Sequence, residues 1–393
     1  MTTNSELAEQ RVLLGDTLAR LLRDSATTQA AVSEGWHAAL WRELEAMGLP
    51  RLLAPESAGG IGGDWEDAQV VARAIGEHAV GLPIVEAMLA HWIAAQAGLE
   101  LRDGRIGIAP MVVGALEGSG APAFRFTGTL HGVPWGRHLD HLLAVAEKDG
   151  QTHLLLLARA QASALREGRN PAGEPRDTLY FDAALTLAMP CDAALPRRLV
   201  YHCALMRVGQ IAGALDAVLA RTVQYARDRV QFGKPIGHFQ AVQQQLAVFG
   251  AEVAAVGCAA RAAFRSATLG DAAFEIAAAK LRANLAIDAG AAIAHQVHGA
   301  IGFTHEYDLR HYTQRLWSWR SEFGNDRHWS ETLGQAVIAR GVDAFWADLT
   351  ARGDAAALGE AVGEAAAAEG GVEGVVEAVV ETAGEAAREA STT

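Results

Sequence analysis

The sequence has few cysteines and no long apolar run. Only Cys191, Cys203 and Cys258 occur among the 393 residues, and none of them forms a C-x-x-C pair. An odd number of widely spaced cysteines is typical of reduced thiols inside a cell and argues against a disulfide framework. The first residues lack the apolar core of a signal peptide, and no uninterrupted run of about eighteen apolar residues predicts a membrane helix. We therefore expect a cytoplasmic protein without a membrane segment.

Basic charge is also scarce. The sequence has 33 Lys and Arg against 46 Asp and Glu, which gives a formal net charge of -13. Nucleic-acid binding needs a basic stripe that neutralises phosphates, so this composition argues against a nucleic-acid partner. Half of the residues are hydrophobic, and the length exceeds what one core normally serves, which predicts a globular protein of two or three domains.

Helical and strand patterns divide the sequence into three blocks. Residues 1–103 have leucines at helical spacing, and Asp64 is expected to cap a helix from Trp65 to His78. Residues 104–196 contain short apolar or alternating runs separated by Gly and Pro, which predicts a small β-domain. Residues 197–350 are helical again. The sequence thus predicts an α+β fold that is mainly α.

The third block contains several apolar stripes. One runs from Val208 to Ala226, a second from Phe239 to Ala260, a third from 271 to 298, and a fourth helix is expected near Glu331. Residues 351–393 are rich in Ala, Gly and Glu and lack aromatic residues. We expect this tail to be flexible, with a short helix that docks on a partner as the alternative.

The stretch Tyr225–Gln240 reads YARDRVQFGKPIGHFQ and indicates an anion site. Arg227 and Arg229 offer guanidinium forks that suit phosphate oxygens, and Gly233 lets the backbone approach a ligand closely. Pro235 is expected to stop the preceding helix. By themselves, Arg229 could also be a solvated helix-end charge and Phe232 a packed core ring.

A second stretch, His295–Tyr307, reads HQVHGAIGFTHEY and is expected to end a helix at Gly299. Together the two stretches resemble the C-terminal domain of the flavin-dependent acyl-CoA dehydrogenases. The N-terminal segments Leu40–Leu49 and Pro55–Gly60 resemble the same family, whereas the middle of the chain matches poorly.

The resemblance implies an N-terminal helical domain, a middle β-barrel-like domain and a C-terminal four-helix bundle. It also implies FAD as cofactor and an acyl-CoA as substrate. In the family these motifs commonly contact the FAD that a neighbouring subunit holds. The implied cofactor residues are Arg229, Gln231, Phe232, Phe239, Gln240, Gln296, Val297, His298, Gly299, Ala300 and Asn325, with Asp326 and Arg327 beside the last.

The middle block departs from the family pattern at the flavin. The family motif G-x-K-x-W-I-T-N corresponds to the segment that begins at Gly128. Gly132 replaces the aromatic residue that covers the flavin, and Pro134 replaces the hydroxyl residue that bonds it. Trp135 is displaced from that position, and whether it substitutes for the aromatic is open at this stage.

The catalytic base of the family is also missing. Removal of an α-proton needs a carboxylate aimed at the carbon, and one branch of the family places it before a glycine that corresponds to Gly324, at Phe323 here. A second branch places it at the position of Cys203, which as a lone cysteine in an apolar helix is expected to be a packed thiol. Glu322 lies one residue from the first position, and such a shift turns a side chain away from the site.

These features predict the base-lacking subunit of a heteromeric (α2β2) acyl-CoA dehydrogenase, which completes the FAD site of a homologous catalytic subunit. One alternative is a self-sufficient homotetramer with Glu322 as base, and another is a non-catalytic scaffold that binds neither ligand. Two H-x-x-H pairs, at His138 and at His295, lack a third ligand, so we expect no metal.

Overall fold

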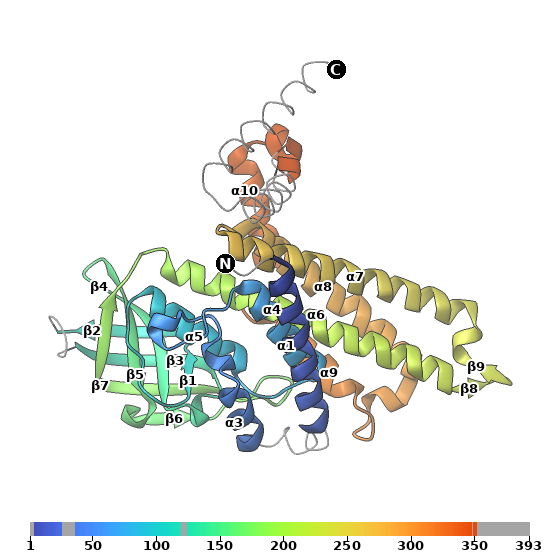
Figure 1. Ribbon diagram of the computed structural model, residues 1–393, viewed down its shortest axis with the longest axis horizontal. Coiled ribbons are helices and arrows are strands. Elements are labelled where there is room, and N and C mark those ends of the chain that lie inside the picture. The colour runs from blue at the N-terminus through green and yellow to red at the C-terminus, as the bar shows by residue number, and fades with distance from the viewer. Residues whose placement is uncertain (1–3, 26–35, 119–123, 348, 352–393) are drawn as a thin grey trace. The chain divides into compact units, whose positions relative to one another are not determined.

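The computed structural model describes residues 4–25, 36–118, 124–347 and 349–351 (Figure 1). Beyond Ala351, the predicted flexible tail lies outside the described residues. The chain divides into two compact units, of which one is Thr17–Ser330 and the other combines residues 1–16 with 331–393. All the sites discussed below belong to Thr17–Ser330.

The N-terminal block is helical, as predicted. Its helices are α1 (Asn4–Ser25), α3 (Ala38–Ala46), α4 (Trp65–Glu77) and α5 (Ile84–Gln96). Asp64 caps α4 in a reciprocal capping box, in which the Asp64 carboxylate accepts from the Asp67 N–H and the Asp67 carboxylate accepts from the Asp64 N–H. This capping box confirms that the helix begins after Asp64, as predicted.

The middle block forms one curled sheet of seven strands in the order β1-β4-β5-β7-β3-β2, with β6 paired to β7. The strands are β1 (Ile106–Ile108), β2 (Met111–Glu117), β3 (Phe124–Pro134), β4 (His141–Lys148), β5 (Gln151–Ala158), β6 (Ala164–Arg166) and β7 (Arg176–Pro190). The first part of β7 pairs with β3 and its last residues pair with β5, so this one strand bends the sheet. Buried Leu, Phe and Ala side chains fill the concave face.

The C-terminal block contains α6 (Leu195–Asp228), α7 (Gln240–Leu269), α8 (Ala273–His298), α9 (Leu309–Ser321) and α10 (Asp326–Arg340). Figure 1 shows α6, α7 and α8 running side by side. The mainly helical α+β class is thus confirmed. The sequence did not predict α9, and α10 begins before the expected Glu331. The predicted domain boundaries stay a prediction.

The prediction that Pro235 ends the first bundle helix is wrong. Helix α6 ends at Asp228, and the chain then forms a small hairpin of β8 (Val230–Gln231) and β9 (Lys234–Pro235). Its two central residues, Phe232 and Gly233, both have positive φ, of 52° and 80°. Positive φ at both positions is the requirement of the tight two-residue hairpin turn, so the turn chemistry and not the proline sets this local structure.

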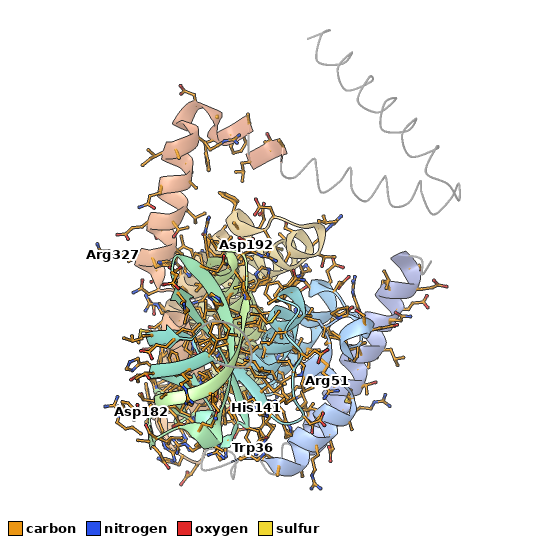
Figure 2. The ribbon with its side chains drawn as sticks, turned by 90° about the vertical axis from the view of Figure 1, so that its left-hand side faces the viewer. Trp36, Arg51, His141, Asp182, Asp192 and Arg327 are labelled. Atoms are coloured by element: carbon orange, nitrogen blue, oxygen red, sulfur yellow. The ribbon has the colours of Figure 1, made fainter. Side chains whose placement is uncertain are left out.

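Two glycines allow α4 and α6 to touch through their backbones. A Cβ on Gly76 would lie 1.9 Å from the Gln210 carbonyl oxygen, and a Cβ on Gly213 would lie 2.0 Å from that of Arg73. Both distances are far below van der Waals contact. The crossing therefore needs glycine on each helix, and it fixes the N-terminal block against the bundle. Figure 2 shows the side chains packed between the strands and helices.

Two of the described helices, α6 and α7, are long and apolar enough to cross a membrane by length and composition alone. In α6, 83% of the apolar window is buried inside the protein, as in a core helix. In α7 only 28% is buried, and its outer face between Gln244 and Arg261 carries no charged residue. The exposed residues on this α7 face are Ala247, Val248, Ala251, Ala254, Ala255 and Cys258.

We expect Gly213→Ala to lower the free energy of unfolding by about 1–3 kcal/mol, because the added methyl group overpacks the α4–α6 crossing. A matched control is Gly250→Ala on α7, where a Cβ meets nothing within 4 Å. Removing a helix glycine there should raise stability by about 0.5–1 kcal/mol. Urea unfolding followed by circular dichroism measures both, and equal effects would contradict the close crossing.

Candidate functional site

The residues predicted to bind the cofactor fall into three places. Arg229, Gln231 and Phe232 lie in or beside the β8–β9 hairpin and are exposed, with Phe232 at 93%. Phe239 packs edge-to-face against Phe232, and Gln240 begins α7. Phe232 is therefore not a core ring, and this segment exposes guanidinium, amide and aromatic groups at the surface.

The second group lies where α8 ends. Gly299 has a φ of 66° and ends α8, as predicted, and Gln296 and Ala300 are exposed beside the buried Val297. The His298 ring stacks on Tyr225, near the end of α6, with ring centroids 4.4 Å apart. This stacking brings the second group to the same end of the bundle as the hairpin.

Two imidazole nitrogens in this second group have no partner among the described residues. His298 Nδ1 lies 2.7 Å from the Ala294 carbonyl oxygen, which leaves Nε2 as an unpartnered acceptor. His295 Nε2 lies 3.0 Å from Thr313 Oγ1, and its Nδ1 is likewise unpartnered. Buried polar atoms are normally hydrogen-bonded, so these two nitrogens are exceptions, and because protein atoms cover both, a ligand at the surface does not reach them.

Asn325 lies apart from both groups. Its side-chain oxygen accepts from the His328 N–H at 3.0 Å at the start of α10. The 13-residue helix α9 separates it from the turn after α8, a length of about 20 Å. The structure thus brings ten of the eleven predicted cofactor residues to one end of the bundle and leaves Asn325 at the other end of α9.

The two positions at which the family has its base converge in space. Cys203 lies one helical turn before Arg207 on α6, and the Arg207 guanidinium lies 5.5 Å from the centre of the Phe323 ring. Cys203 is 4% exposed, and burial raises the pKa of its thiol far above the ordinary value. Phe323 has no proton acceptor. Neither position holds a base.

Glu322, the acid next to Phe323, is fully engaged by two arginines. Its Oε1 accepts from Arg176 Nε at 2.9 Å, and its Oε2 accepts from Arg207 Nε at 2.8 Å. Burial favours the protonated form, but the charges and hydrogen bonds of Arg176 and Arg207 outweigh it and lower the pKa of Glu322 to about 2. A carboxylate held in this way is a poor proton acceptor near neutral pH.

Arg207 and Arg176 each pair with a second carboxylate besides Glu322, which extends the ion pairs into a network. Arg207 Nη2 donates to Glu86 on α5 at 2.6 Å. Burial lowers the pKa of Arg207, but Glu322 and Glu86 oppose this more strongly and hold it above its ordinary value. On the other side, Arg176 contacts Glu174 at 3.4 Å, and Glu174 accepts from Arg315 Nε at 2.9 Å. We call Glu86, Arg207, Glu322, Arg176, Glu174 and Arg315 the buried ionic network; within it the side chains of Glu322 and Arg176 keep 19% and 12% exposure.

Trp135 is tied to the same network. Its side chain is 4% exposed, and the Arg176 guanidinium lies 5.2 Å from the ring centre. The backbone N–H of Trp135 donates to the Pro175 carbonyl oxygen at 3.1 Å, and the residue has a φ of 51°. The ring therefore has no open face on which a flavin could lie. Trp135 does not substitute for the missing aromatic residue.

A buried lysine fixes the loop that carries Glu322. Lys280 on α8 donates from Nζ to the carbonyl oxygens of Trp319, Arg320 and Gly324 and to Asn284 Oδ1, at 2.6–3.2 Å. Burial, and next the charge of Arg207, lower its pKa to about 7. This group closes the end of α9 and sets the backbone from which Glu322 reaches the arginines.

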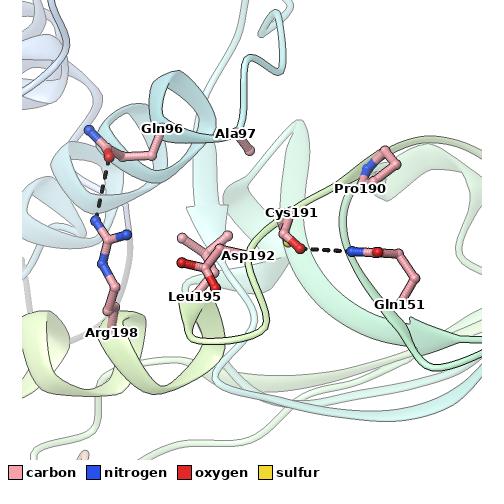
Figure 3. A pocket seen from close by; sticks show the side chains of 8 residues that line it. All are labelled: Gln96, Ala97, Gln151, Pro190, Cys191, Asp192, Leu195 and Arg198. Carbon is pink, nitrogen blue, oxygen red and sulfur yellow. Dashed lines mark hydrogen bonds between the residues drawn. The ribbon is translucent and has the colours of Figure 1, made fainter.

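A shallow pocket of about 330 Å³ lies where α6 begins, away from these groups (Figure 3). The Gln151 amide donates to the Cys191 carbonyl oxygen, and Arg198 donates to Gln96 Oε1. Burial and the neighbouring Asp192 raise the pKa of the Cys191 thiol, so it is not an activated nucleophile.

Within the described part of the chain, no cluster of three His, Cys, Asp or Glu side chains could hold a metal ion.

The network was not predicted from the sequence. A signal was nevertheless present, since Arg207 occupies a position between Cys203 and Ile211 on the apolar stripe of α6. An arginine at that spacing is buried only if carboxylates reach it. The sequence does not say which ones.

Comparison with known proteins identifies relatives. The family model "Acyl-CoA dehydrogenase, C-terminal domain" matches residues 197–335. The acyl-CoA dehydrogenase IpdE2 of Mycobacterium tuberculosis is 30% identical over 324 residues, which are 78% of this chain and 91% of that protein. IpdE2 of Mycolicibacterium smegmatis is 29% identical over 324 residues, which are 79% of this chain and 93% of that protein.

Two solved structures share the fold over most of their length. The ChsE4-ChsE5 complex from Mycobacterium tuberculosis has a TM-score of 0.76 and 24% identity, covering 84% of this chain and 97% of that chain. A variant of the Tcur3481-Tcur3483 steroid ACAD also has a TM-score of 0.76, with 25% identity, and covers 86% of this chain and 99% of that chain.

We expect Glu322→Gln to lower the free energy of unfolding at neutral pH by about 2–4 kcal/mol, because it leaves the buried Arg207 and the partly exposed Arg176 incompletely paired. Since the folded-state pKa of Glu322 lies near 2 against an ordinary 4.5, its stabilisation is complete above pH 4.5 and is lost as the pH falls toward 2. Urea midpoints from pH 6 to pH 2.5 should therefore fall more steeply for the wild type than for the variant. The exposed Glu306→Gln serves as control, and parallel pH curves for all three would refute the assignment.

Proposed function

Because this chain belongs to the acyl-CoA dehydrogenase family, we propose that it is a subunit of an FAD-dependent acyl-CoA dehydrogenase that lacks the catalytic base. It completes the cofactor site of a homologous catalytic subunit. The complex removes an α-proton and a β-hydride from an acyl-CoA thioester. FAD, when bound, accepts the hydride.

The state of Glu322 carries this proposal. A general base must be unprotonated, free to turn to the carbon and able to take a proton near the working pH. Glu322 meets the first condition only, because Arg176 and Arg207 occupy both of its oxygens. The two family base positions beside it hold a buried thiol and a phenyl ring. The proton must then go to a group of another chain.

Cofactor residues that face outward support the second half of the proposal. The exposed Arg229 guanidinium suits the pyrophosphate of a dinucleotide, and Phe232 offers a flat face to a ring. These groups bind and orient the cofactor from outside the catalytic interior, while the partner excludes water from the reacting carbons and moves the proton.

The α7 face supports a partner of the same fold. Small, uncharged side chains allow another helix to approach closely, and an exposed apolar face of this length is typical of an assembly surface. A homotetramer would bury the same face, so we propose the α2β2 form on the evidence of Glu322 and not of the surface. Since the relative with 25% identity is a steroid ACAD, a steroid-derived acyl-CoA is the first substrate to test.

We expect the isolated chain to reduce no electron acceptor when acyl-CoA is added. Co-expression with a homologous base-containing chain should give a yellow complex with activity, because each chain supplies what the other lacks. Purification with and without the partner, absorbance near the flavin band, and turnover measure this. An isolated chain that turns over, and loses turnover in Glu322→Gln, would establish the self-sufficient enzyme instead.

We expect Arg229→Ala to weaken FAD binding by the complex about 10-fold or more, because it removes a charge-assisted hydrogen bond to phosphate. Arg42→Ala is the matched control, since Arg42 is exposed on α3 and its Nε bonds its own helix at the Ala38 carbonyl oxygen. Gel filtration followed by flavin release, and titration of the apo-complex, measure the effect. Equal FAD retention in both variants would remove the hairpin from the cofactor site.

A further inference from the structure

The segment Gly299–Phe303, which contains the predicted cofactor residue Ala300, packs on two histidines of α8. We call this segment the cofactor turn. Its buried residue is Gly302, where a Cβ would lie 3.2 Å from His295 Nδ1 and 3.1 Å from His298 Cβ. The two histidines are only 8% and 4% exposed. They therefore support the cofactor turn from inside the protein, and a ligand at the surface meets the turn and not their unpartnered nitrogens.

Aromatic rings hold both histidines in place. His295 lies between Phe303 of the cofactor turn and Trp317 of α9, with ring centroids 4.1 Å and 5.7 Å away and ring planes within 18°. His298 lies three residues further along α8, on the same face of the helix, and stacks on Tyr225 of α6 at 4.4 Å. The two imidazole rings thus connect the cofactor turn to α6 and α9.

The hydrogen bonds assign one proton to each imidazole. His298 Nδ1 donates to the Ala294 carbonyl oxygen at 2.7 Å, so Nε2 carries a lone pair. His295 Nε2 donates to Thr313 Oγ1 at 3.0 Å, which leaves Nδ1 without a proton beside Gly302. A second proton on either ring would form a buried N–H without an acceptor among the described residues. Burial lowers the pKa of both rings, and the charge of His298 lowers that of His295 further.

The surroundings do little to stabilise charged rings. Stacked aromatic faces attract a cation, but a charged ring here loses its water and gains an unpaired N–H, which opposes this attraction. Neither Asp228 nor Asp308 shifts the pKa of either histidine, and the α9 side chains in contact with His295 are the uncharged Thr313 and Trp317. The titratable and charged side chains around His298 and its neighbouring ring are Arg221, Tyr225, Asp228, Tyr307 and Asp308.

Building on the function proposed above, we propose that His295 and His298 are positioning residues that hold the cofactor turn in place only while both rings are neutral. Acid protonates the rings, the turn opens, and the complex releases FAD. In an opened turn the rings reach water and take up protons near the ordinary pKa of 6.5. Since the closed turn disfavours these protons, it is fully stable above pH 6.5 and loses stability as the pH falls below that value.

The pH dependence of FAD binding tests this in the complex with the catalytic partner. We expect the Kd for FAD to rise about tenfold or more between pH 7.5 and pH 5.5, because one pKa unit corresponds to about a factor of ten. The double variant His295→Gln and His298→Phe should show less than about a twofold change. The exposed His305→Gln serves as control and should behave as the wild type.

A merely structural role of the two histidines gives a different result, because the double variant would then bind FAD more weakly by the same factor at both pH values. That result overturns the inference, as does a wild-type Kd that changes less than twofold. Should the double variant not fold, His298→Phe is measured alone. About half of the logarithmic change in Kd is then expected, and a full change overturns the inference.

Hydrogen exchange of the isolated full-length chain provides a measurement without FAD or a partner. Peptides that cover residues 296–307 are followed by mass spectrometry, and their protection is expressed relative to the unfolded chain at the same pH. We expect protection to fall about tenfold from pH 7.5 to pH 5.5 in the wild type and to stay constant in the double variant. Constant protection in the wild type overturns the inference. Failure of the proposed function looks different, because no base-containing chain would then give an FAD complex while the exchange still responds to pH.

Discussion

The burial of the Arg207 guanidinium on α6, the longest of the described helices, is the constraint on which much of this structure depends. Arg207 is 2% exposed, and its charge would be strongly unfavourable there without carboxylates. Glu86 and Glu322 supply them from positions 121 and 115 residues away in the sequence. The N-terminal helices, the bundle and, through Arg176, the β-domain therefore meet at one point. Lys280 holds the loop that brings Glu322 to that point.

The same pairing divides the protein into a closed interior and an open end. Inside, every carboxylate of the buried ionic network has an arginine, so no acid there is free to exchange protons. At the far end of α6, the hairpin exposes Arg229 and Phe232. These exposed guanidinium and aromatic groups can contact another molecule, whereas the charged groups of the interior are already paired with one another.

Local rules predicted the local features. Asp64 was identified as a cap, and Gly299 as a helix end, because each depends on residues within one turn. The hairpin at Phe232 and Gly233 was not predicted, since a phenylalanine at positive φ is uncommon. Helix α9 was missed because its arginines and tryptophans obscure the apolar period. The partners of Glu322 could not be predicted at all, since they come from α6 and from the start of β7, which only the fold brings together.

The exposed α7 face, which includes Val248 and several alanines, affects the solubility of this protein. A chain without a partner would expose the α7 face and the Phe232 ring of the β8–β9 hairpin to other proteins. Surplus molecules would adhere to one another or be removed by quality control. In the proposed complex, this predicts that the chain stays in solution only when its partner is made in a matching amount.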